Sequence, residues 1–145
     1  EQKAIDAARI LGEHLGLPWT EVEALGENDR SATGFLPPPE FEQVANAFFA
    51  QPTVSVRGWE RACDAQARMV RAVDAIAAAE ADARRVLIVA HGAVGTLLYC
   101  HLAGLPIDRR WDQPPNKGGN YFGFTLQPRG VQSWWRAIDE ELHPA

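Results

Sequence analysis

The sequence predicts an α/β fold, more specifically a three-layer α/β/α sandwich with a mostly parallel central sheet. Segments with apolar residues at helical spacing alternate along the chain with short β-type segments, the pattern of helices packed on both faces of a sheet. Residues 86–90 are a continuous aliphatic run, typical of a strand buried on both faces. The 145 residues suit one domain, so we treat 1–145 as a single domain.

Helices dominate the first half of the chain. An apolar stripe at spacings of three and four predicts a helix over residues 1–15, which Gly16 would end. Polar and apolar side chains alternate over 19–25, which predicts a short strand. Helical stripes then recur twice, so the expected order is a loop over 26–39, a helix over 40–50, a connector over 51–57 and a helix over 58–81.

The second half begins with the strand expected at 86–90. His91 and Gly92 interrupt it, and a helix is expected over 93–103. Prolines and glycines predict a loop over 109–119. The β-type segments at 121–126 and 131–138, joined by a turn at 127–130, predict two antiparallel strands. The acidic tail at 139–145 is expected to be frayed.

Composition argues against several kinds of partner. The chain has 14 basic and 19 acidic residues, a net charge of −5. Nonspecific nucleic-acid binding needs a net basic face to displace counterions, so we expect no nucleic-acid partner. The apolar runs are far shorter than the ~20 residues that span a bilayer, so we expect no membrane partner. The oligomeric state stays open, a homodimer included.

The two cysteines indicate a cellular location. Cys63 and Cys100 form no CxxC pair, and a domain of this size does not need a disulfide. Reduced thiols are typical of cytosolic proteins, so we expect a cytoplasmic location.

The sharpest local feature is the step from strand to helix at His91 and Gly92. It places an imidazole at the carboxyl end of a sheet strand, where open α/β sheets bind ligands. The free amides and positive dipole end of the following helix suit an anion, and Gly92 lets a ligand approach the backbone closely. In the alternative interpretation His91 merely caps the helix or fills a gap. The local pattern does not decide between the two.

Two charged residues in the 26–39 loop are further candidates. Glu27 follows the predicted strand at 19–25, where a carboxyl group can act as a general acid or base, although loop carboxylates are usually just solvated. Arg30 can bind an anion, but its default role is to pair with Asp29. Of the other histidines, we expect His14 and His143 to be solvated and His101 to be a packing or surface residue.

Motifs for other chemistries are missing from the sequence. There is no GxSxG, GxxxxGK[ST] or GxGxxG, which argues against a serine hydrolase elbow and nucleotide phosphate loops. His91, His101 and Cys100 do not have the spacing of metal ligands, and no HExxH or CxxC is present. We therefore expect neither a metal nor another cofactor.

Three stretches resemble the histidine phosphatase superfamily, the phosphoglycerate mutase-like proteins. They are AHGAVGTLL at 90–98 after the aliphatic run, GGNY at 118–121 and KAIDAA at 3–8. The resemblance extends over essentially the whole chain. It implies a phosphoryl-transfer site in which His91 binds the phosphoryl oxygens and Glu27 protonates the leaving oxygen, then activates water. The substrate-binding residues implied beside them are Lys3, Gly92, Arg30 and Asn120.

The sequence departs from that family at two places. The family's nucleophile lies in an Arg-His-Gly motif after the first strand, and this sequence contains no Arg-His-Gly. We expect a segment upstream of Glu1 to carry that strand and histidine, and the chain from Glu1 alone to be poorly soluble or partly unfolded. Lys3 stands where the family usually has arginine, and Ala7 where threonine is common. Lysine keeps the charge but loses the bidentate fork.

Four functions stay open at this point. The favoured one is a phosphatase that acts on a small phosphomonoester through a phosphohistidine. The others are a phosphoglycerate mutase-type phosphomutase, a noncatalytic member that binds phosphorylated ligands or a partner, and an unrelated α/β domain with a structural His91. Nothing identifies recognition of a small carboxylated phosphoester, and the chain leaves little room for a lid, so a phosphatase is preferred. In it, the His91 ring should face an open pocket shared with Lys3 and Glu27.

Overall fold

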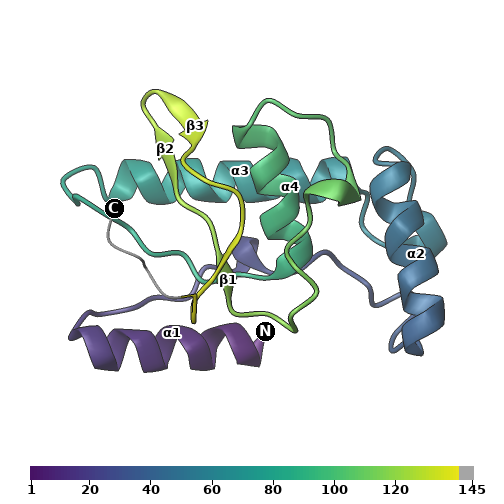
Figure 1. The fold of residues 1–145 in the computed structure, drawn as a ribbon, viewed down its shortest axis with the longest axis horizontal. Coiled ribbons are helices and arrows are strands. Elements are labelled where there is room, and N and C mark those ends of the chain that lie inside the picture. The colour runs from purple at the N-terminus through teal and green to yellow at the C-terminus, as the bar shows by residue number, and fades with distance from the viewer. Residues whose placement is uncertain (141–145) are drawn as a thin grey trace.

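The computed structural model describes residues 1–140 and contains helices and short strands (Figure 1). This mixture is compatible with an α/β fold. The elements are α1 (Gln2–Leu15), η1 (Glu23–Leu25), α2 (Pro38–Ala50), η2 (Val56–Gly58), α3 (Ala62–Ala79), α4 (Gly92–Leu102), η3 (Arg109–Trp111), β1 (Asn120–Tyr121), β2 (Phe124–Leu126), β3 (Arg129–Val131) and β4 (Arg136–Ala137), where η marks a 3-10 helix. Most of the acidic tail, residues 141–145, lies outside the described residues.

The four predicted helices are confirmed, with shifted ends. Gly16 ends α1 in a left-handed conformation, φ 66°, as expected of a glycine there. Helix α2 begins at Pro38, inside the predicted loop, because proline fits the first turn of a helix, where no intrahelical N–H is needed. Helix α3 begins at Ala62 rather than 58, because Arg57 and Gly58 have φ of 51° and 80° and break the helical path.

The antiparallel strands near the C-terminus are confirmed in kind but are shorter than predicted. β1 pairs with β4, and β2 pairs with β3 in the register Phe124↔Val131. Each predicted strand is interrupted between its two pieces. The interruption lets the Trp135 ring pack edge-on against Phe122 at a centroid distance of 4.8 Å, which the ladder would not allow.

Two predicted strands are wrong for residues 1–140. Residues 19–25 contain only the single turn η1, and 86–90 have no regular structure and no backbone pairing within the described part of the chain. Val86 and Leu87 are 47% and 63% exposed. The aliphatic side chains of residues 86–90 favour burial. A strand also needs a neighbouring backbone with which to form hydrogen bonds. In Figure 1 the segment runs between α1 and α3 towards the start of α4.

The core lies where α3 packs against α4, with α2 at one end. Ala62 and Ala65 on α3 are fully buried and let α4 approach closely, with Leu97 buried opposite. The Gln66 amide donates to the Leu97 carbonyl at 2.8 Å and ties the two helices together. Trp59, 1% exposed, closes the core towards α2 and packs against Phe48.

Helix α1 contributes little to this core. Gly12 is its one buried residue, and Trp19 packs against it. Of the predicted apolar stripe, Leu15 is exposed, whereas Ile5, Ala8 and Leu11 are half-buried. Figure 1 shows α1 along one side of the molecule, beneath α3 in this view. The α1 stripe is therefore only partly covered within the described residues.

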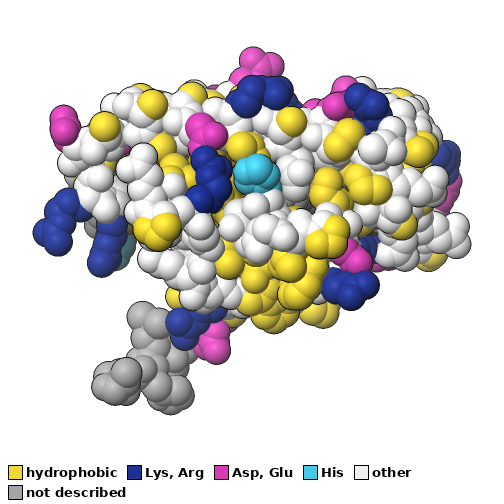
Figure 2. All heavy atoms as spheres, turned by 90° about the horizontal axis from the view of Figure 1, so that it is seen from above, with side chains coloured by type: hydrophobic (Ala, Val, Ile, Leu, Met, Phe, Trp, Pro, Cys, Tyr) yellow, Lys and Arg dark blue, Asp and Glu magenta, His cyan; other side chains and the backbone are white. Residues whose placement is uncertain are grey.

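The surface carries mixed charges on the face drawn in Figure 2. Basic and acidic side chains are interspersed there, and hydrophobic side chains gather along one edge. Among residues 1–140, none of the helices combines the length and hydrophobicity of a membrane span.

We predict that Trp59→Ala lowers the free energy of unfolding by about 3–5 kcal/mol, because it empties the site of a fully buried indole. It also removes the donor to the Thr33 hydroxyl, which lies 2.8 Å from Nε1. Urea denaturation followed by circular dichroism measures the change. Trp134→Ala, at a position 46% exposed, is the control and should cost less than about 1 kcal/mol. Equal losses in the two variants would contradict this account of the core.

Candidate active site

His91 is the residue directly before α4 and is buried there. Its backbone is extended, φ −125° and ψ 163°, and its side chain is 2% exposed. His91 stands at the N-cap position of α4, but its ring makes no capping hydrogen bond to the helix. Its Nδ1 lies 3.8 Å from Glu1 Oε2. Burial lowers the pKa of the His91 imidazole below its usual 6.5, while the negative charges of Glu27 and Glu1 act to raise it.

Glu27 binds the N-terminal end of α4, the helix end that the sequence predicts to suit an anion. Its carboxylate accepts hydrogen bonds from the backbone amides of Val94 and Ala93, at 3.1 and 3.3 Å, and from Asn28 N at 3.2 Å. The carboxylate thus serves as the cap of α4, where the helix dipole favours negative charge. His91 and Glu27, chosen from separate parts of the sequence, therefore meet at the same helix end.

Arg30 completes the charge balance at Glu27. Its guanidinium lies 3.4 Å from Glu27 Oε2 and donates twice to Asn28 Oδ1, at 3.1 and 2.9 Å. It also stacks over the rings of Phe41 and Trp59, 5.0 Å from each centroid. The default pairing with Asp29 is wrong, because the Asp29 carboxylate turns back to accept from the Ser31 amide at 2.8 Å.

Lys3 reaches the same region from α1. Its side chain is 76% exposed, with Nζ 3.6 Å from Glu1 Oε2. Its positive charge acts to lower the pKa of His91, which places it within electrostatic reach of the ring. Glu1 Oε2 thus lies between the Lys3 ammonium and the His91 ring.

Gly92 and Asn120 are connected through a residue that the sequence analysis missed. A side chain at Gly92 would collide with the Gln113 amide, which packs against the Gly92 backbone. Asn120 Nδ2 in turn donates to Gln113 Oε1 at 2.9 Å. Thr96 anchors this loop, since its hydroxyl bonds Asp112 Oδ1 at 2.8 Å. A polar residue directly before Pro114 was the only signal that could have singled out Gln113.

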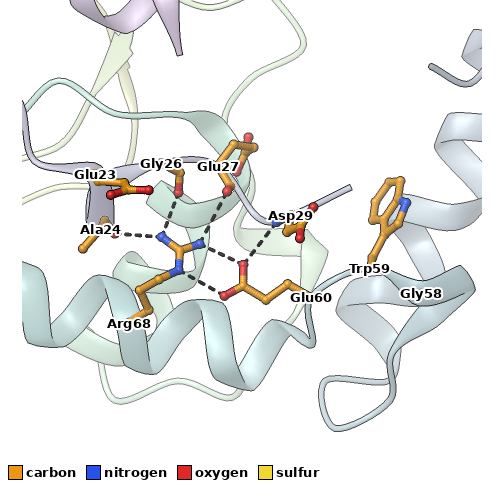
Figure 3. Close-up of a pocket in the computed structure, with 9 residues that line it drawn as sticks. All are labelled: Glu23, Ala24, Gly26, Glu27, Asp29, Gly58, Trp59, Glu60 and Arg68. Carbon is orange, nitrogen blue, oxygen red and sulfur yellow. Dashed lines mark hydrogen bonds and ion pairs between the residues drawn. The ribbon is translucent and has the colours of Figure 1, made fainter. Parts of the chain in front are cut away.

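The expected open pocket shared by His91, Lys3 and Glu27 is wrong for this structure. Glu1 and the buried start of α4 enclose the ring instead. Glu27 lines a different hollow, an open pocket of about 800 Å³ (Figure 3). Its walls are Glu23, Ala24, Gly26, Glu27, Asp29, Gly58, Trp59, Glu60 and Arg68. The pocket therefore opens on the side of the Glu27 loop that α3 faces.

The sequence analysis also missed three polar residues beside Glu27. Arg68 and Glu60 form an ion pair of 2.8 Å that binds the Glu27 loop. Asn28 is 3% exposed, and its Nδ2 is the one buried side-chain N or O atom of residues 1–140 without a hydrogen-bond partner. Arg68 occupies an ordinary polar position of α3 outside its apolar stripe, so no sequence signal marked it.

The remaining candidates lie apart from this cluster. His14 and His101 are exposed, and His143 falls outside the described residues. Cys63 and Cys100 are both unpaired thiols, and burial raises the pKa of the Cys100 thiol. Within residues 1–140, no three His, Cys, Asp or Glu side chains are grouped to hold a metal ion.

A carboxylate, an imidazole and two cationic side chains at one helix N-terminus are the groups used in phosphoryl transfer, which depends on positioned charge and a proton donor. The sequence matches the family model of the histidine phosphatase superfamily (branch 1) over residues 1–133. The chain belongs to this superfamily, and the resemblance seen in the sequence is confirmed. Comparisons with curated proteins and with solved structures find no match.

We predict that His91 titrates below pH 6.5 in the folded protein, as NMR of its ring resonances would show, because burial disfavours the charged ring. Glu27→Gln should lower this pKa further by removing a negative charge. Since the unfolded chain takes up this proton first, the free energy of unfolding should fall as pH drops below about 6.5. His91→Gln should remove that component. A ring that titrated above 6.5 would contradict the burial.

Proposed function

We propose that this protein hydrolyses a small phosphomonoester through a phosphohistidine. The observation that carries the proposal is the meeting of His91 and Glu27 at the first turn of α4, in a chain of the histidine phosphatase superfamily. Phosphoryl transfer depends mainly on positioned positive charge and a proton donor, and both kinds of group lie near the start of α4.

Each residue has a stated role in the proposed reaction. The nucleophilic histidine attacks phosphorus, and the bond from phosphorus to the leaving oxygen breaks. Glu27 gives its proton to that oxygen and later takes one from the water that cleaves the phosphohistidine. His91 and Lys3 bind the phosphoryl oxygens. Arg30, Gly92 and Asn120 complete the substrate-binding set, Asn120 acting through the Gln113 amide that it holds.

We propose further that a segment preceding Glu1 supplies the nucleophile on a strand that pairs with residues 86–90. The support is the partly exposed aliphatic run immediately before His91, whose backbone pairs with no residue between 1 and 140. A histidine at the carboxyl end of such a strand would lie beside His91, because parallel neighbours end at the same edge. With this strand the central sheet of the proposed three-layer sandwich would be built around 86–90.

A phosphatase is preferred to a phosphomutase because none of the site residues within 1–140 identifies a carboxylated phosphoester. A noncatalytic role in binding a phosphorylated ligand or a partner stays the alternative. The α4 amides that would bind a phosphate are already bonded to Glu27, so a phosphate has to displace that carboxylate in either role.

The remaining parts of the proposal concern partners and location. We propose a metal-free reaction on a small phosphorylated substrate, with neither nucleic acid nor membrane as partner and with the oligomeric state, a homodimer included, left open. A cytoplasmic location is in keeping with the unpaired Cys63 and Cys100.

We predict that the protein with its upstream segment takes up an acid-labile ³²P label from a labelled ester, with a chelator present throughout. The chain 1–145 alone should take up none. Acid-labile, base-stable label is the signature of phosphohistidine, and mass spectrometry locates it.

Label at His91 in the chain 1–145 would overturn both the assigned roles and the proposed upstream segment. Activity that disappears with the chelator and returns with a divalent ion would point to a metallophosphatase. Tight phosphate binding by the longer protein without any label would favour the noncatalytic alternative.

We predict that Glu27→Gln slows turnover of an alkyl phosphate about 100-fold or more, the usual range for loss of a general acid. Turnover of 4-nitrophenyl phosphate should fall far less, because its leaving group needs no proton. The two kcat values are measured on the same enzyme preparation.

Glu23→Gln is the control, since Glu23 lines the same pocket on the same loop but is not assigned a role. It should leave both rates unchanged. Equal loss on both esters in Glu27→Gln would mean that Glu27 positions the substrate or supports the fold.

A further inference from the structure

The loop that carries Glu27 is held by very little secondary structure of its own. It has one 3-10 turn before it and no strand, so local backbone bonding does not fix where Glu27 lies. Short irregular loops of this kind are mobile unless other groups bind their backbone. A general acid must nevertheless be held to within a fraction of an ångström, so some other part of the protein has to supply the constraint.

Arg68, from the middle of α3, binds the backbone of this loop (Figure 3). Its Nη1 donates to the carbonyl oxygens of Ala24 and Gly26 at 2.7 and 3.0 Å, and its Nη2 donates to that of Glu27 at 3.4 Å. One guanidinium therefore donates hydrogen bonds to three of the four backbone carbonyls of residues 24–27.

Glu60 holds the guanidinium and the far end of the loop. Its carboxylate accepts from Arg68 Nε at 3.0 Å and from Nη2 at 2.8 Å, so the pair is bidentate. The same carboxylate accepts from the Asp29 amide at 3.2 Å, and the Glu60 amide donates to the Asp29 carbonyl at 2.9 Å. The hydrogen bond to Glu60 raises the pKa of the Arg68 guanidinium.

These contacts grip the loop on both sides of Glu27 and leave its carboxylate free to face α4. Arg68 touches the peptide carbonyl of Glu27, whereas the carboxylate bonds Ala93 and Val94 at the opposite side. Because α3 also packs directly on α4, the clamp on α3 sets the distance from the loop to the start of α4.

We infer that Arg68, held by Glu60, is a positioning residue that places the Glu27 carboxylate against the first turn of α4. Arg68 touches none of the residues proposed to bind the substrate. The chemical consequence rests on the proposed function, whereas the placement of the carboxylate does not.

The first test measures the placement alone, by amide hydrogen exchange in the intact protein. Arg68→Gln and Glu60→Gln should each speed exchange at Ala93 and Val94 by about fivefold or more, the factor that a hydrogen bond of ordinary strength gives. Glu27→Ala, which removes both acceptor oxygens, sets the size of the full effect. Arg61→Gln, which breaks an exposed ion pair with Asp64 at the start of the same helix, is the matched control and should change neither amide.

The second test measures the chemistry. Arg68→Gln should lower kcat for an alkyl phosphate about tenfold or more beyond its effect on 4-nitrophenyl phosphate, as expected when an acid is displaced by about an ångström. Arg68→Lys, which keeps the charge but makes fewer of the carbonyl bonds, should recover part of the loss.

The outcomes separate this inference from the proposed function. Unchanged exchange at Ala93 and Val94 in a folded Arg68→Gln protein overturns it, as does faster exchange spread evenly over α3 and α4. If Arg68→Gln does not fold, Glu60→Gln decides by the same criteria. Equal loss of kcat on both esters also overturns it. A wild-type protein that hydrolyses neither ester removes the proposed function but leaves the exchange result in force.

Discussion

The packing of α3 against α4 determines where the Glu27 loop and His91 lie. Two alanines on α3 remove the side-chain bulk between the helices, and Gln66 fixes their relative position by bonding a carbonyl of α4. From this contact α3 presents Arg68 to the Glu27 loop, while α4 presents its amide end to the Glu27 carboxylate. The loop is thus bound at its backbone by one helix and at its side chain by the other, and His91 is held directly before the second.

The Glu27 carboxylate is saturated in this arrangement. Oε1 accepts from the amides of Asn28 and Val94, and Oε2 from that of Ala93, with Arg30 beside it. The helix dipole and the guanidinium together offset its negative charge. A phosphate and this carboxylate are ligands for the same donors, so in the proposed reaction a phosphate competes with Glu27 for the start of α4. In this structure that helix end is not an empty anion site, because the carboxylate occupies it.

Helices could be predicted here because their apolar stripes are local, and the starts of α2 and α3 moved where Pro38 and Gly58 change the backbone conformation. The strands expected at 19–25 and 86–90 could not, because strand pairing depends on a distant backbone. The run at 86–90 reads as a buried strand, yet none of residues 1–140 pairs with it. Glu27 and His91 could be chosen from their places in the sequence. Arg68 could not, because it binds carbonyl groups that every residue possesses and that leave no pattern in a sequence.

This choice of carbonyl groups bears on how the site can change over evolution or in the laboratory. A clamp that binds only backbone atoms does not depend on which side chain stands at position 27. Aspartate, glutamine or histidine can occupy that position while Arg68 still holds the peptide in place. The side chain proposed to donate the proton can therefore be exchanged without rebuilding its support, which makes the loop a natural starting point for redesigning the chemistry proposed for this protein.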